Sequence, residues 1–170
     1  MPQAAPPDIA LLLLDEPNLR RLAAARPMDL DGALVFEGSL PPTHVAVRAL
    51  AQLEAGTPAP WCVPYLIASG ADARLAILGG CRFKSAPVDG CVEIGYGVAA
   101  SQRGRGIASA AVGRMLQFAA TSGMVRQVVA HIVPDNIASA AVVSRLGFSR
   151  GESLLDTDGE TVVRWTRCMD

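Results

Sequence analysis

Arg103-Gly104-Arg105-Gly106-Ile107-Ala108-Ser109 stands between an apolar, strand-like run at residues 92–98 and a helical pattern at residues 106–120. A glycine-rich turn between a strand and a helix leaves several backbone N–H groups without partners, at the positive end of the helix dipole. The two arginines among the glycines add charges that pair with phosphate oxygens. The stretch therefore predicts a binding site for a phosphorylated ligand at the start of the helix.

Two common phosphate-binding motifs do not fit this stretch. A Walker-type loop requires a lysine after its last glycine, and the stretch contains no lysine. A dinucleotide fingerprint requires a third glycine where Ser109 stands, and an acidic residue about 20 positions after the first glycine, where Met124 stands. The pattern that remains is Arg-x-x-Gly-x-Ala, formed by Arg103, Gly106 and Ala108.

This remaining pattern resembles the acetyl-coenzyme A motif of the GNAT acetyltransferases. Further along the chain, Asn136 followed eleven residues later by Gly147-Phe148 is similar to the Asn…Gly-Phe pattern of that family. The Glu-Ile-Gly-Tyr-Gly-Val run at residues 93–98, and Asn136 with Ser139, look like the Rim-type branch, which acetylates the N-termini of ribosomal proteins. The similarity covers residues 79–148. Three motifs in this order are specific for the family, but they do not identify the substrate.

The resemblance implies acetyl-coenzyme A as co-substrate, with no metal ion. It implies that the Asn136 side chain contacts pantetheine, that Ser139 lies near the thiol, and that a backbone N–H of the 92–98 strand polarises the thioester carbonyl. The predicted cofactor-binding residues are Gly97, Val98, Arg103, Gly104, Arg105, Gly106, Ile107, Ala108, Ser109 and Asn136.

The strand at residues 92–98 has two unlike faces. Val92, Ile94, Tyr96 and Val98 alternate with Cys91, Glu93, Gly95 and Gly97. The first face is expected in the core. Because glycine within a strand often marks the close approach of a ligand or of another backbone, the second face predicts room for a slender pantetheine arm beside Glu93.

Acetyl transfer to an amine requires a base, because an alkylamine is mostly protonated at neutral pH. Glu93 is the favoured base and His131 the rival. Many GNAT enzymes have a tyrosine seven residues after the asparagine to protonate the thiolate, and here that position is Val143. Ser139, acting through water, is the substitute, with Tyr65 and Tyr96 left open.

The order of apolar runs predicts one α+β domain over residues 1–170. We expect a GNAT-like, mixed, mostly antiparallel seven-stranded sheet with a central βαβ crossover and flanking helices. Residues 27–42 are expected to be irregular. A hairpin turn is expected at residues 69–72. The expected strands are 9–14, 63–68, 75–84, 92–98, 125–133, 149–155 and 161–167, and the expected helices are 16–25, 44–55, 106–120 and a short one ending at Leu146.

Composition argues against nucleic acid as a partner and against a membrane-spanning segment. With a net charge of −1 and 18% charged residues, the chain has no basic field for nucleic acid. The four leucines at residues 11–14 are far short of the roughly 20 apolar residues that a membrane span needs. Residues 1–7 lack the Lys or Arg of a signal peptide, so we expect them to be a short flexible tail. Without secretion, we expect a cytoplasmic protein in which the four cysteines are free thiols.

The sequence thus predicts an N-acetyltransferase that moves an acetyl group directly, in a ternary complex, to a peptide or protein N-terminus or to a small-molecule amine. A module that binds acyl-coenzyme A without turnover is the alternative. The acceptor, the use of other acyl-coenzyme A thioesters and a homodimeric state are left open.

Overall fold

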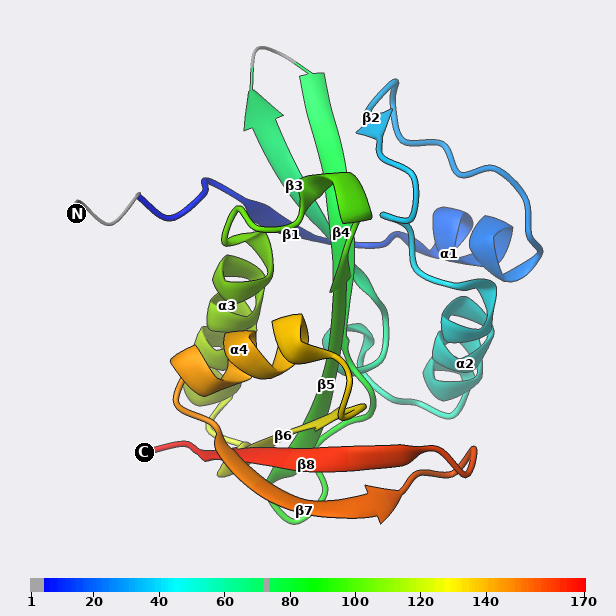
Figure 1. The fold of residues 1–170 in the computed structure, drawn as a ribbon. Helices are drawn as coiled ribbons and strands as arrows, with labels where there is room; N and C mark the ends of the chain where they lie inside the picture. Colours follow the sequence, from blue (N-terminus) through cyan, green and yellow to red (C-terminus); the bar gives the residue numbers. More distant parts are fainter. Residues whose placement is uncertain (1–4, 72–73) are drawn as a thin grey trace.

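The computed structural model describes residues 5–71 and 74–170, shown in Figure 1. Asp72, in the predicted hairpin turn, and residues 1–4 of the predicted tail lie outside the described residues. The elements are β1 (Ala10–Leu13), α1 (Glu16–Ala23), β2 (Leu34–Val35), α2 (Thr43–Glu54), η1 (Ala59–Trp61), β3 (Tyr65–Ala71), β4 (Arg74–Phe83), β5 (Cys91–Val98), η2 (Ala100–Gln102), α3 (Ile107–Ser122), β6 (Gln127–Ile132), α4 (Ile137–Arg145), β7 (Ser149–Leu155) and β8 (Thr161–Cys168).

The sheet has the strand order β1-β3-β4-β5-β6-β8-β7, with β2 beside β4. Its pairs are antiparallel except β5 with β6 and β2 with β4. The α+β class and the central crossover, β5–α3–β6, are confirmed. The predicted count of seven strands was wrong, because Leu34 and Val35 form an eighth strand within the region expected to be irregular. This strand exists only through its pairing with Ala76 and Ile77, which leaves no periodic signal in the sequence.

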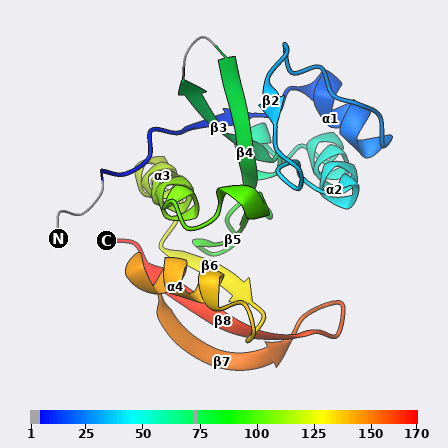
Figure 2. The same cartoon turned by 45° about the horizontal axis from the view of Figure 1, so that its top comes forward.

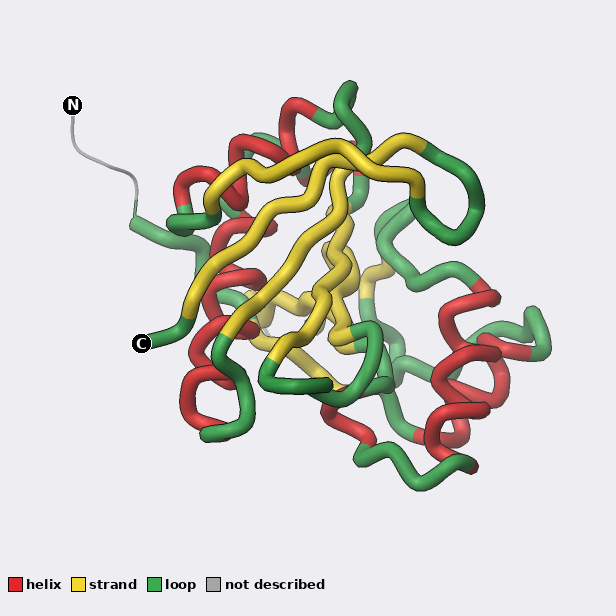
Figure 3. Tube along the Cα trace, turned by 90° about the horizontal axis from the view of Figure 1, so that it is seen from below, coloured by secondary structure: helices red, strands yellow, loops and turns green. Residues whose placement is uncertain are grey.

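Helices cover both faces of the sheet. Helices α3 and α4 lie on one face and α1 and α2 on the other, as Figures 1 and 3 show from two directions. Under α3, the buried residues Ala111, Val112 and Met115 belong to the same apolar cluster as Val92 and Ile94 of β5. A second cluster lies under α1 and α2. It includes Leu19, Ala46, Ala49 and Ile77.

Strand β5 lies at the centre of the sheet, and its two neighbours follow it over different lengths. With β4 it pairs as far as Gly79↔Val98, whereas with β6 the register ends at Glu93↔Val129. The second half of β5 therefore has a strand partner on one side only. Figure 2 shows β4 in the upper part of the molecule, β5 below it, and β6, β8 and β7 beneath β5. The end of the β5–β6 pairing at Glu93 positions the groups described next.

Candidate functional site

The start of α3 is an open backbone cradle. Gly104 and Gly106 have φ values of 75° and 76°, in the left-handed region that favours glycine. Gly106 is the N-cap residue and provides no side chain to bond the first N–H groups of the helix. A Cβ at Gly104 would meet nothing within 4 Å, and one at Gly106 would meet only Pro7 Cδ at 3.6 Å. Free N–H groups at a helix start are suited to phosphate oxygens.

The arginines of the cradle are exposed, and neither has a carboxylate partner among the described residues. Arg103 turns back toward β5, and its Nε donates to the Val98 carbonyl oxygen over 3.2 Å. Arg105 lies between the two left-handed glycines, and helix α3 begins directly after them with Ile107, Ala108 and Ser109. The residues present therefore fit a phosphate-bearing group such as coenzyme A.

The free edge of β5 presents backbone groups toward the gap between β5 and β6. The Lys84 N–H donates to the Glu93 carbonyl, and the Ala99 N–H to the Leu78 carbonyl, each over 2.9 Å. Since bonding directions alternate along a strand, the backbone groups of Tyr96 and Val98 point away from β4. These groups are suited to the amides of a pantetheine arm.

The two glycines of β5 serve different purposes. A Cβ at Gly97 would meet nothing within 4 Å, so this position opens onto free space, and its contact with pantetheine stays a prediction. At Gly95, an added Cβ would lie 3.4 Å from Lys84 Cε and 3.6 Å from Arg82 Nε. The space over Gly95 is therefore occupied by two basic side chains, not left open for pantetheine.

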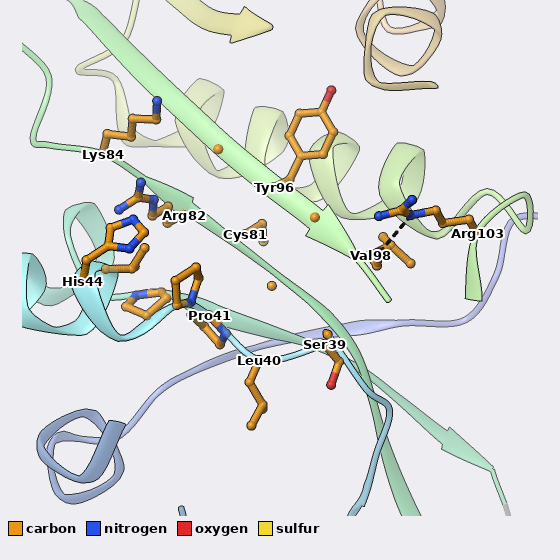
Figure 4. A pocket seen from close by; sticks show the side chains of 17 residues that line it. Ser39, Leu40, Pro41, His44, Cys81, Arg82, Lys84, Tyr96, Val98 and Arg103 are labelled. Atoms are coloured by element: carbon orange, nitrogen blue, oxygen red, sulfur yellow. Dashed lines mark hydrogen bonds between the residues drawn. The ribbon is translucent and has the colours of Figure 1, made fainter. Parts of the chain in front are cut away.

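A cavity of about 440 Å³ lies on the face of the sheet that carries α2. Its walls are residues 38–45, the second half of β4 and the second half of β5 (Figure 4). His44, Arg82 and Lys84 gather toward one end, and Arg103 lies at the other. His44, Arg82 and Lys84 were not predicted as site residues, although Arg82 and Lys84 are two charges, two residues apart, at the end of an otherwise apolar run.

Glu93 and His131, the two candidate bases, contact each other. His131 Nδ1 lies 2.9 Å from Glu93 Oε1, and the same oxygen lies 2.5 Å from Lys84 Nζ. Burial alone would raise the pKa of the Glu93 carboxyl, but the hydrogen bonds from Lys84 and His131 hold it below its usual value. Neither Glu93 nor His131 lines the cavity, whose wall at this point is Lys84.

Asn136 and Ser139 lie at the start of α4. Asn136 Oδ1 caps the helix by accepting from the Ser139 N–H over 3.1 Å, which leaves its amide Nδ2 for a ligand. The Tyr96 hydroxyl donates to the Ser139 carbonyl over 3.0 Å. Val143 is fully buried, so the usual tyrosine position carries no polar group. Tyr65 donates to the Pro60 carbonyl, and its pKa is raised to about 12, mainly by burial.

Among the described residues, none forms a group of three or more His, Cys, Asp or Glu side chains able to hold a metal ion. Within the same residues, no helix has the length and apolar character needed to cross a membrane. All four cysteines are free thiols.

Comparison with solved structures finds the same fold in several acetyltransferases. RimJ of Mycobacterium smegmatis with CoA-disulfide has 20% sequence identity and a TM-score of 0.65, over 94% of this chain and 81% of that chain. RimL, a ribosomal L7/L12 α-N-protein acetyltransferase in complex with coenzyme A, has 21% identity and a TM-score of 0.64, over 95% and 94%. The aminoglycoside acetyltransferase AAC(6')-Ib with coenzyme A has 17% identity and a TM-score of 0.65, over 95% of each chain.

Among curated proteins, a sequence search finds no match to the chain. A family model described as an acetyltransferase (GNAT) domain matches residues 18–149, which is most of the chain. The resemblance predicted from the motifs at residues 79–148 is thereby confirmed, and it is extended to the first half of the chain. The chain belongs to the GNAT family of acetyl-coenzyme A-dependent acyltransferases.

Proposed function

We propose that this protein transfers an acetyl group from acetyl-coenzyme A to a primary amine, with a peptide or protein N-terminus as the preferred acceptor. The observation that carries the proposal is the contact between Glu93 and His131 where β5 and β6 diverge, next to the cavity. A carboxylate–imidazole pair next to an open cavity, further along β5 from the cradle for phosphate, is suited to deprotonating an acceptor.

His131 is the better suited of the two groups to accept a proton, although both lie behind Lys84 in the cavity wall. With its pKa lowered, the Glu93 carboxyl is ionised at neutral pH and only accepts hydrogen bonds. The contact therefore requires a hydrogen on His131 Nδ1, and the neutral ring keeps its lone pair on Nε2. Glu93 would act as a positioning residue that fixes the ring, as carboxylates do for catalytic histidines in hydrolases. The proton would pass from the amine to Nε2, directly or through water.

Acetyl-coenzyme A supplies an acetyl thioester whose leaving group is a thiolate. The N–H groups of Tyr96 and Val98 on the free edge of β5 would bind the arm and polarise the carbonyl. The residues named for the cradle, Arg103 to Ser109 with Gly97 and Asn136, would hold the remainder. Ser139 and the Tyr96 hydroxyl, which lie together at the start of α4, are the candidates to protonate the thiolate.

Direct transfer is favoured over an acyl-enzyme. Cys81 lines the cavity, but burial raises the pKa of its thiol to about 12, so almost none is thiolate at neutral pH. Without a reactive nucleophile there, the amine itself must attack. An α-amine has a pKa near 8 against about 10.4 for lysine, so its neutral form is over a hundredfold more abundant at pH 7. This difference favours an N-terminus as the acceptor.

The test is thiol release from acetyl-coenzyme A with a panel of peptides and small amines. We expect release with peptide N-termini, and a loss of turnover of roughly 10²-fold in His131→Gln and a smaller loss in Glu93→Gln, with unchanged coenzyme A affinity. Unaltered turnover in His131→Gln would remove it from the mechanism. Coenzyme A binding without thiol release for any amine would favour the alternative, a sensor module, for which the buried Val143 is the supporting observation.

A further inference from the structure

We infer that the acceptor carries an anionic group close to its amine, and that Arg82, flanked by His44 and Arg48, binds this group. The inference rests on the proposed function, because it assigns the substrate class of the same cavity.

The charges around the cavity are of one sign. Four basic residues line it, His44, Arg82, Lys84 and Arg103, and no Asp or Glu is among the described residues that do so. Glu93, just behind the wall, already bonds to Lys84 and His131. Glu93 also attracts the Arg82 guanidinium through space, but among the described residues it forms no hydrogen bond or ion pair with it.

Arg82 has no ionic partner among the described residues. It is half-buried on β4, opposite Gly95, and its Nε would lie 3.6 Å from a Cβ at that glycine. Within the described part of the chain, its guanidinium has no hydrogen bond or ion pair. Burial and the nearby Arg48 hold the pKa of Arg82 below its usual value. A guanidinium in this position gains from an anion, which it can bind with two parallel N–H groups.

Helix α2 supplies the second basic wall. His44, Arg48 and Gln52 follow one another at intervals of four residues, so they share one face of the helix. Gln52 Nε2 donates to the Lys84 carbonyl over 3.0 Å, which fixes this face against the end of β4. His44 and Arg48 are exposed, and so they are available to a ligand that enters the cavity.

Arg82 is badly placed for the phosphates of coenzyme A. It lies opposite Gly95, whereas the cradle at the start of α3 follows Val98, three strand residues or about 10 Å further along β5. Polycationic amines are disfavoured by the same charges. An acidic residue after the N-terminal amine of a peptide, or a carboxylate or phosphate on a small amine, has the chemistry that the site would recognise.

The experiment compares acceptors that differ only in charge. One arm uses peptides with Asp, Asn or Lys at position 2, and a second arm uses small amines with and without a carboxylate or phosphate. We expect kcat/KM to be about 10- to 100-fold higher for Asp than for Asn, the range for a hydrogen-bonded charge pair. A preference confined to one arm identifies whether the anion belongs to a peptide or to a small molecule.

Three variants test whether Arg82 causes the preference for an anionic acceptor. Arg82→Gln should reduce the Asp/Asn ratio to about one and Arg82→Lys should retain part of it, with unchanged coenzyme A affinity by calorimetry. Arg74→Gln is the matched control, since it removes an exposed charge from the other end of the same strand. Because the Asp/Asn ratio of kcat/KM is measured within each variant, a smaller amount of folded protein lowers both values equally and leaves the ratio unchanged.

Equal kcat/KM for Asp and Asn peptides and for charged and uncharged small amines would overturn the inference, as would a preference that survives in Arg82→Gln. Weaker coenzyme A binding in Arg82→Gln would assign this residue to the cofactor instead. Calorimetry of the coenzyme A complex with the Asp and Asn peptides needs no turnover. It therefore separates a failure of this inference from a failure of the proposed acetyl transfer.

Discussion

Replacing Gly106 by Ala tests whether the left-handed turn before α3 forms the cofactor cradle. Gly106 has φ of 76°, and an added Cβ would meet only Pro7 Cδ at 3.6 Å. The cost is therefore one of backbone conformation, not of crowding. A left-handed non-glycine residue costs about 1–2 kcal/mol, and this is the expected loss in the free energy of unfolding.

Gly113→Ala is the matched control. Gly113 lies within the same helix, and its added Cβ meets nothing within 4 Å. There, alanine should stabilise the protein by about 0.5–1 kcal/mol, because glycine is a poor helix former. The two substitutions are chemically identical, yet the expected changes have opposite signs. For a chain of this length, each kcal/mol shifts Tm by about 2–4 °C.

Denaturant unfolding gives the stability of each variant, and calorimetry gives its affinity for coenzyme A. If Gly106→Ala relieves its strain by turning the loop, one N–H bond to a charged phosphate is lost, which weakens binding about 10- to 100-fold. Gly113→Ala should bind as the unmodified protein does. The reasoning is refuted if Gly106→Ala is as stable as Gly113→Ala and also binds coenzyme A with unchanged affinity.

Two further predictions follow from the contacts of the site. Because the pKa of Glu93 is lowered in the folded protein, its ionised form stabilises the fold above the unfolded value near 4.3, and this contribution disappears as the pH falls through the folded pKa. As the pH falls below this unfolded value, the unfolding free energy should thus decrease more steeply in the unmodified protein than in Glu93→Gln; parallel curves would contradict this. If the Tyr96 hydroxyl beside Ser139 protonates the thiolate, turnover should fall at high pH, where the hydroxyl loses its proton. Tyr96→Phe should then lower turnover and remove this fall at high pH. An unchanged pH–rate profile would leave Ser139→Ala as the next variant to measure.

The fold was largely predictable because its signals are local. Alternation over residues 92–98 and the apolar face of α3 depend on neighbours along the chain, and both correspond to buried residues. The eighth strand was not predictable, since Leu34 and Val35 are extended only because Ala76 and Ile77 offer them a partner. The end of β3 was also missed. Gly70 and Ala71 read as turn residues but continue the strand.

In the candidate site too, groups that are adjacent in sequence were predictable, and groups that only the fold brings together were not. The cradle at the start of α3 is contiguous in sequence, so its residues could be named in advance. The contact of Glu93 with His131 depends on the parallel register of β5 and β6, in which Glu93 is opposite Val129, and no spacing in the sequence encodes that register. The gathering of Arg82 with His44 and Arg48 depends likewise on how α2 packs against β4.

The short pairing of β5 with β6 has a consequence for how ligand binding affects stability. Among the described residues, three registered pairs join a half-sheet of β1, β3, β4 and β5 to a half-sheet of β6, β8 and β7. A coenzyme bound in the gap would bridge the two halves and add binding free energy to folding, about 2.7 kcal/mol at a hundred times its dissociation constant. The free energy of unfolding would then rise with the concentration of coenzyme A, even though the ligand adds no contact within either half of the sheet.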